Sequence, residues 1–108
     1  MPAFLLLAFA ILSEVGATLA LRVSDGFSRP IPSAIVVVGY GISFWLLALA
    51  LKDIPVSLTY AIWSGVGTAL IAVAGVVAFG ETMNLMKFAS LGIIVLGVAG
   101  LSAAGGAH

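Results

Sequence analysis

Glu14 is the residue of this sequence whose type and position could do chemistry. It lies inside the apolar run FLLLAFAILSEVGATLAL, residues 4–21, which holds no other charged residue. At a rise of about 1.5 Å per residue, Glu14 lies roughly 15 Å along a helix from Phe4, near the midplane of a hydrocarbon core about 30 Å thick. A charge at that depth costs at least about 2.5 kcal/mol, so carboxylates kept there usually serve function. A structural ion pair is the weaker alternative, because no apolar run supplies a cation.

The composition places that carboxylate in a membrane protein. Of 108 residues, 63% are hydrophobic and only 7% are charged, and the mean hydropathy is +1.32. Soluble domains carry about 25% charged residues. The chain is long enough for four spans but not for a cofactor-binding module, so we expect no cofactor. The absence of cysteine excludes thiolate metal sites. His108, at the end of the chain, is expected to be a solvated terminus and not a metal ligand, and the zero net charge gives no reason to expect nucleic acid.

The apolar runs predict an all-α protein made of one transmembrane domain over residues 1–108. They are about twice as long as a barrel strand and show no polar alternation. The first run lacks a basic leader segment and is too long for a signal-peptide core, so we expect it to be retained. The predicted spans are residues 3–21, 33–51, 55–79 and 85–103.

Turn and cap residues set the predicted ends of these spans. Asp25-Gly26 is a turn signal, and the prolines at 30 and 32 suit a helix start. Ser33 is the predicted N-cap of the second span, Pro55 fits the first turn of the third, and Asn84 is the predicted N-cap of the fourth.

The charges in the links leave the membrane orientation open. Arg22, Arg29 and Lys87 fall on one side of the predicted bilayer, whereas Lys52 and the amino terminus fall on the other. By the positive-inside rule, such a small difference in the number of cations between the two sides determines the orientation only weakly. On charge alone, insertion in both orientations and insertion in one are equally compatible with the sequence.

Small residues surround Glu14 on its own helical face. Residues three and four positions away share that face. They leave room for a pocket beside the carboxylate, although small residues also simply let membrane helices approach closely. The predicted lining from this span is Leu7, Ala10, Ile11, Ala17 and Thr18.

Aromatic and hydroxyl residues recur at helical spacing in the next two spans. The second span offers Tyr40, Ser43, Phe44 and Leu47, and the third offers Tyr60 and Trp63. Tyrosine hydroxyls can hydrogen-bond a carboxylate and aromatic faces attract organic cations, so we expect these residues to meet Glu14. For Tyr60 and Trp63, an ordinary place in the interfacial aromatic belt is the alternative.

Glycines and small residues mark two further features. Gly65 and Gly67 fall near the middle of the third span, where glycine weakens a helix, so they predict a hinge; close helix packing is the alternative. In the fourth span, Ser90, Gly97 and Leu101 form one stripe, and we assign this span to helix association.

The segments SEVGAT, GFSRPIPS, SFWLLALAL and TYAIWSGVGT resemble the small multidrug resistance transporters, and the resemblance covers essentially the whole chain. It implies an antiparallel, dual-topology homodimer of four-helix subunits in a prokaryotic plasma membrane, which exports toxic cations in exchange for protons. It also implies that Glu14 binds either substrate or proton, that Tyr60 and Trp63 line the site with Tyr40 and Ser43 around it, and that the fourth span dimerises.

The family has a branch for quaternary ammonium and polyaromatic cations and a branch for guanidinium ions. Guanidinium exporters typically carry tryptophan three residues after the glutamate, where this chain has Ala17, so it resembles the multidrug branch. Two departures from the family pattern are Arg22, where lysine is frequent, and Ser90, where glycine is frequent in the dimerisation stripe. A guanidinium exporter and, less favoured, an accessory subunit of a lipid flippase remain the alternatives. No nucleophile and base pair, metal cluster or phosphate loop points to an enzyme.

Overall fold

The computed structural model describes residues 2–104, so the prediction for His108 lies outside the described part. Within it the chain forms four α-helices and no strand: α1 Ala3–Val23, α2 Pro30–Ala50, α3 Val56–Phe79 and α4 Leu85–Ala103. Each helix is long and apolar enough to cross a membrane. A helix satisfies its backbone hydrogen bonds internally, which is what a segment in hydrocarbon requires. The predicted all-α architecture is confirmed.

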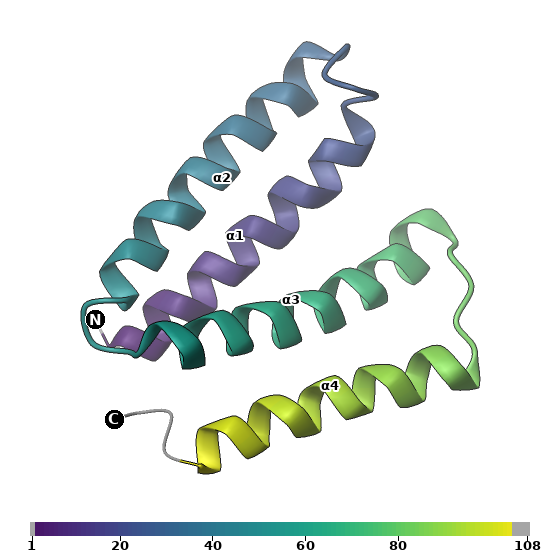
Figure 1. Cartoon of the computed structure of the whole chain (residues 1–108). Coiled ribbons are helices and arrows are strands. Elements are labelled where there is room, and N and C mark those ends of the chain that lie inside the picture. The colour runs from purple at the N-terminus through teal and green to yellow at the C-terminus, as the bar shows by residue number, and fades with distance from the viewer. Residues whose placement is uncertain (1, 105–108) are drawn as a thin grey trace. The chain divides into compact units, whose positions relative to one another are not determined.

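The chain divides into two compact units, Met1–Asp53 and Ile54–His108. Each unit contains one pair of helices joined by a short link. In the first unit α1 and α2 run antiparallel and side by side, and in the second α3 and α4 do the same (Figure 1). The first unit carries Glu14, and the second carries Tyr60 and Trp63.

The link of the first unit turns through three consecutive left-handed residues. Asp25, Gly26 and Phe27 have φ angles of 51°, 68° and 67°, a conformation that costs a residue with a side chain about 1–2 kcal/mol. Ser24 holds the turn: its fully buried hydroxyl donates to the Leu21 carbonyl at 2.6 Å and accepts from the Phe27 amide at 3.1 Å. The Asp25-Gly26 turn signal correctly located this turn.

The start of α2 differs from the predicted start. The helix begins at Pro30 and not at Ser33, with Arg29 as N-cap. Proline at the first helical position needs no amide donor and already has a helical φ, so the proline pair extends the helix by one turn. The Ser33 hydroxyl donates to the Arg29 carbonyl at 2.5 Å, and the prediction of Ser33 as N-cap was wrong.

The other helix ends lie close to their predicted positions. Helix α1 continues two residues beyond residue 21, α2 ends at Ala50, one residue early, and α3 begins immediately after Pro55. Helix α4 has the predicted bounds, and its predicted cap is confirmed because Asn84 Oδ1 accepts from the Lys87 amide at 2.8 Å.

Candidate functional site

Glu14 lies in the middle of α1, eleven residues after Ala3 and nine before Val23. Its side chain is half-buried in the chain. A continuous helix of this length places the carboxylate about 16 Å from the first residue, near the centre of a bilayer that α1 spans. The depth expected from the sequence therefore agrees with the bounds of the helix.

A hydroxyl bridge joins Glu14 to the neighbouring helix. Thr18 Oγ1 donates to Glu14 Oε1 at 3.1 Å and lies 2.6 Å from the Tyr40 hydroxyl. A threonine hydroxyl has only one proton, so while Thr18 donates to Glu14 it must accept from Tyr40. The chain of donation then runs from Tyr40 through Thr18 to the carboxylate. Tyr40 meets Glu14 in this way through Thr18, and not by the direct contact expected from the sequence.

Ser43 joins α1 and α2 at a different level. Its fully buried hydroxyl donates to the Ala10 carbonyl at 2.8 Å. Because a serine hydroxyl has a single proton, Ser43 in this arrangement has none to offer Glu14. Within this subunit Ser43 connects the two helices, and its expected role at a substrate site stays a prediction.

Close packing fills much of the space expected beside the carboxylate. Ala10 and Ala17 are 0% and 1% exposed, and a Cβ placed on Gly39 of α2 would lie 2.8 Å from the Ala17 Cβ. Small residues on one face of α1 thus let α2 approach closely, the alternative that the sequence left open. Leu7 and Ile11 are also buried.

The aromatic residues of α2 lie on the outer side of the bridge. The rings of Tyr40 and Phe44 have centroids 6.5 Å apart and planes tilted by 32°. Tyr40 is half-buried, whereas Phe44 is 59% exposed. Leu47, one turn further along, is half-buried. Tyr40, at the end of the hydrogen-bond chain, and the exposed Phe44 therefore form an aromatic surface on the outside of α2.

Tyr60 and Trp63 lie in the second unit, near the start of α3. Tyr60 is 73% exposed, which leaves its ring and hydroxyl available to a partner, and Trp63 is half-buried. Their spacing of three residues places both on one side of α3.

The glycines predicted to form a hinge lie within an uninterrupted helix. Helix α3 is continuous across Gly65 and Gly67, and both are buried. A Cβ on Gly65 would lie 2.5 Å from Val98 Cγ2 and 3.5 Å from Ile94 Cγ2 of α4. Close packing therefore explains Gly65, while a hinge at this pair stays a prediction.

Helix α4 contributes surface and little core. None of its described residues is buried. Ser90, Gly97 and Leu101 of the predicted association stripe are all exposed, and a Cβ on Gly97 would meet nothing within 4 Å. The stripe is thus open in the single chain.

Sequence reasoning missed Ser13 and understated Thr18. Ser13 donates to the Gly39 carbonyl at 2.8 Å, and Thr18 was expected only as pocket lining. The signal was present in the residue types, because Ser13 and Thr18 carry hydroxyls inside an apolar run and a hydroxyl in hydrocarbon requires a hydrogen-bond partner. The positions of those partners on α2 depend on the register of the helix pair, which spacing within one helix does not give.

Comparison with known proteins agrees with this architecture over nearly the whole chain. Residues 2–94 match the family described as Small Multidrug Resistance protein. The chain is 45% identical to the quaternary ammonium compound-resistance protein QacF of Klebsiella aerogenes, covering 94% of this chain and 93% of that protein. It is 47% identical to the multidrug resistance protein EbrA of Bacillus licheniformis, covering 88% and 90%, and 45% identical to the quaternary ammonium compound-resistance protein QacE of Escherichia coli, covering 91% and 89%.

Proposed function

Because the chain belongs to the Small Multidrug Resistance protein family, we propose that it is a proton-coupled antiporter that exports lipophilic quaternary ammonium and polyaromatic cations. Its four membrane-spanning helices and bacterial relatives make it a multi-pass protein of the bacterial inner membrane. The relatives are named for resistance to quaternary ammonium compounds and to multiple drugs, which supports a transporter and gives the substrate class we propose.

The placement of Glu14 is the observation that carries this proposal. The carboxylate lies halfway along a spanning helix and is joined to Tyr40 through Thr18. A group held at that depth exchanges a proton or pairs with a cation, since either one removes the cost of an isolated charge. If the two ligands compete for one carboxylate, release of one drives binding of the other, and this competition is sufficient for coupled exchange.

We assign the aromatic residues to recognition of the cation. Aromatic rings attract organic cations through their negative faces, by about 0.5–2 kcal/mol each. Tyr60 is exposed, and Tyr40 and Phe44 form an aromatic surface next to the bridge. Together with Trp63 they would contact a flat or aromatic cation while Glu14 balances its charge.

A second copy of the chain would complete the transporter. Transport by alternating access usually needs two structural repeats about a site near the midplane, and the described part of this chain, residues 2–104, has one midplane carboxylate and four helices. The exposed stripe Ser90, Gly97 and Leu101 offers two small residues, Ser90 and Gly97, for helix association. An antiparallel homodimer would bring two Glu14 residues to one site, and exchange of conformation between the subunits, with bending at Gly65 to Gly67, would open it to either side.

The packing of Ala17 favours the multidrug branch over the guanidinium branch. Ala17 is 1% exposed and faces Gly39 of α2, so an indole at this position has no room in the observed helix pair. A guanidinium exporter remains the second candidate, and comparing uptake of guanidinium with that of a quaternary ammonium ion separates the two.

Reconstituted vesicles test the proposed function. Purified protein in liposomes with an imposed pH gradient should drive accumulation of tetraphenylphosphonium on the acidic side, and Glu14→Gln should abolish it. Glu81→Gln, which removes a carboxylate in the link between α3 and α4, is the matched control and should keep transport. Accumulation that survives in Glu14→Gln, or that does not depend on the pH gradient, would reject the proposal.

A further inference from the structure

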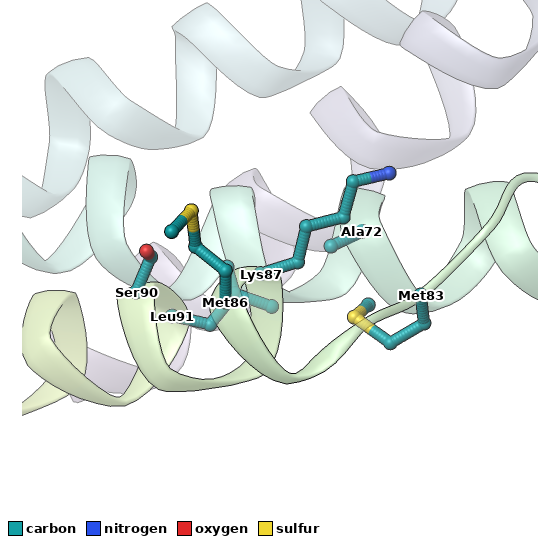
Figure 2. Close-up of a pocket in the computed structure, with 6 residues that line it drawn as sticks. All are labelled: Ala72, Met83, Met86, Lys87, Ser90 and Leu91. Carbon is teal, nitrogen blue, oxygen red and sulfur yellow. The ribbon is translucent and has the colours of Figure 1, made fainter.

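The link between α3 and α4 covers one end of an open pocket in the second unit. The pocket has a volume of about 400 Å³, within the range of small-molecule sites. Figure 2 shows its side chains: Ala72 comes from α3, Met83 from the link, and Met86, Lys87, Ser90 and Leu91 from the first turns of α4. Its lining is almost entirely apolar, with one cation at the rim.

Lys87 points its ammonium group back towards the link. Its Nζ donates to the Thr82 carbonyl at 2.6 Å and lies 3.4 Å from Thr82 Oγ1. Lysines near the ends of spanning helices extend in this way to keep the charge at the polar boundary while the stem stays in the apolar layer. The ammonium therefore marks the level of the lipid headgroups, and it has three donors, of which the Thr82 contacts use at most two.

The remainder of the pocket extends from that level into the hydrocarbon. Ser90 and Leu91 lie three and four residues beyond Lys87 on α4, about 5 Å deeper. Ala72 lies seven residues before the end of α3, about 10 Å from that end. The two methionines have flexible side chains that adapt to irregular apolar partners. A cation at the headgroup level above an apolar groove matches a molecule with an anionic head and an aliphatic tail.

We propose that this pocket binds an anionic phospholipid, with a phosphate oxygen on Lys87 Nζ and an acyl chain along Ala72, Met86 and Leu91. Lys87 is the only lysine or arginine between residues 54 and 108. Within this unit it is therefore the one lysine or arginine side chain with which a bound anionic headgroup can pair. A second copy packed on the stripe of Ser90, Gly97 and Leu101 would share Ser90 with this pocket. It is a less suitable occupant of the part around Lys87, because lysine is depleted from the cores of protein interfaces, whereas a phosphate satisfies the ammonium group.

Native mass spectrometry of the full-length protein in detergent tests this site. With added palmitoyl-oleoyl phosphatidylglycerol, the wild type should retain the lipid, and it should retain palmitoyl-oleoyl phosphatidylcholine more weakly. Lys87→Gln keeps an unbranched polar side chain, one atom shorter, and removes its charge, and it should weaken phosphatidylglycerol binding about fivefold. Lys52→Gln, in the link between α2 and α3, is the matched control and should bind as the wild type does. Ala72→Leu fills the groove without changing charge and should also weaken binding, and circular dichroism verifies that each variant keeps its helix content.

Each contrary result has a specific meaning. Equal losses of phosphatidylglycerol binding in Lys87→Gln and Lys52→Gln would show that the lipid responds to surface charge in general, and this would reject the site. Displacement of the lipid by millimolar inorganic phosphate would show an anion site without a lipid tail. A dimer that falls to monomer in Lys87→Gln, with lipid retention unchanged, would show that a second copy occupies the groove and overturn the proposal.

Discussion

Thr18 links the two chemically active residues of the first unit. Its hydroxyl lies between the Glu14 carboxylate and the Tyr40 hydroxyl, so it determines whether the tyrosine can stabilise the ionised carboxylate. A hydrogen bond of this kind contributes about 0.5–1.5 kcal/mol net. The sequence placed Thr18 on the correct face, but its role as a bridge depends on how α2 is aligned with α1, which the spacing in either helix alone does not specify.

Removing the Thr18 hydroxyl should weaken cation binding. Thr18→Val keeps the shape and deletes the bridge, so the ionised carboxylate that pairs with the cation loses a hydrogen-bond donor. We expect the affinity for tetraphenylphosphonium at neutral pH to fall about two- to tenfold, measured by equilibrium dialysis. Thr18→Ser restores the hydroxyl and should bind as the wild type does. An unchanged affinity in Thr18→Val would show that the bridge has no part in binding.

Replacing Trp63 should discriminate between substrates. A cation–π contact contributes about 0.5–2 kcal/mol, and aromatic cations also stack on the ring. Trp63→Leu should therefore reduce transport of tetraphenylphosphonium more than transport of tetramethylammonium in the same vesicles. Trp45→Leu removes an indole that is 63% exposed on α2 and serves as the control. Equal losses for both cations in Trp63→Leu would identify Trp63 as scaffold.

Close contact between helices determines the form of the helix pairs. In the first unit two hydrogen bonds connect α1 and α2: the Ser13 hydroxyl donates to the Gly39 carbonyl and the Ser43 hydroxyl donates to the Ala10 carbonyl, both at 2.8 Å. Without a hydrophobic driving force between helices in lipid, close packing and hydrogen bonds of this kind hold a pair together. In the second unit Gly65 allows Val98 to approach α3.

Two glycines of α2 allow a direct measurement of this packing. Both Gly39→Ala and Gly41→Ala gain about 1 kcal/mol of helix propensity. Only at Gly39 does the new methyl meet another atom, the Ala17 Cβ at 2.8 Å, whereas at Gly41 nothing lies within 4 Å. We expect Gly39→Ala to be less stable than Gly41→Ala by about 1–3 kcal/mol in dodecyl sulfate unfolding followed by circular dichroism. Equal stabilities of the two variants would show that α1 and α2 pack less closely at Gly39 than the structure indicates.

Helix ends show what sequence patterns can and cannot predict. The length of the apolar runs predicted all four helices, because a spanning helix needs about 20 such residues. Asn84 was a correct cap, and no proline just before it starts the helix earlier. Ser33 was wrong because Pro30 already supplied a better helix start. Local chemistry thus predicts the elements well, and errors occur where two adjacent signals compete for the same end.

At the level of the assembled protein, the pairing of α4 with α3 leaves much of α4 exposed. None of the described residues of α4 is buried, and its exposed apolar residues include Phe88 and Leu96, at 71% and 72%. An apolar surface of this kind is suited to contact with lipid or with another helix. The stripe of small residues predicts where a second copy would pack, but nothing within one chain specifies the partner's direction, since the link charges are nearly balanced.

Enlarging the predicted stripe should break the dimer. A Cβ on Gly97 and a Cβ on Gly92 both meet nothing within 4 Å in the single chain, so neither substitution should disturb α3 and α4. Gly97→Leu overpacks the proposed helix interface at a cost of about 1–3 kcal/mol, and we expect dimer dissociation to increase at least about fivefold in detergent, measured by energy transfer between labelled copies. Gly92→Leu, off the stripe, should dissociate as the wild type does. If both variants dissociate alike, the stripe is not the interface.

Competition between a proton and a cation for Glu14 can be measured as proton release when the cation is added. Glu14 is proposed to bind a proton or a lipophilic cation and never both. Purified protein in weakly buffered detergent should acidify the solution when tetraphenylphosphonium is added, and Glu14→Gln should neither release protons nor bind the cation. Cation binding without proton release in the wild type, across a range of pH, or undiminished binding in Glu14→Gln, would contradict this proposal.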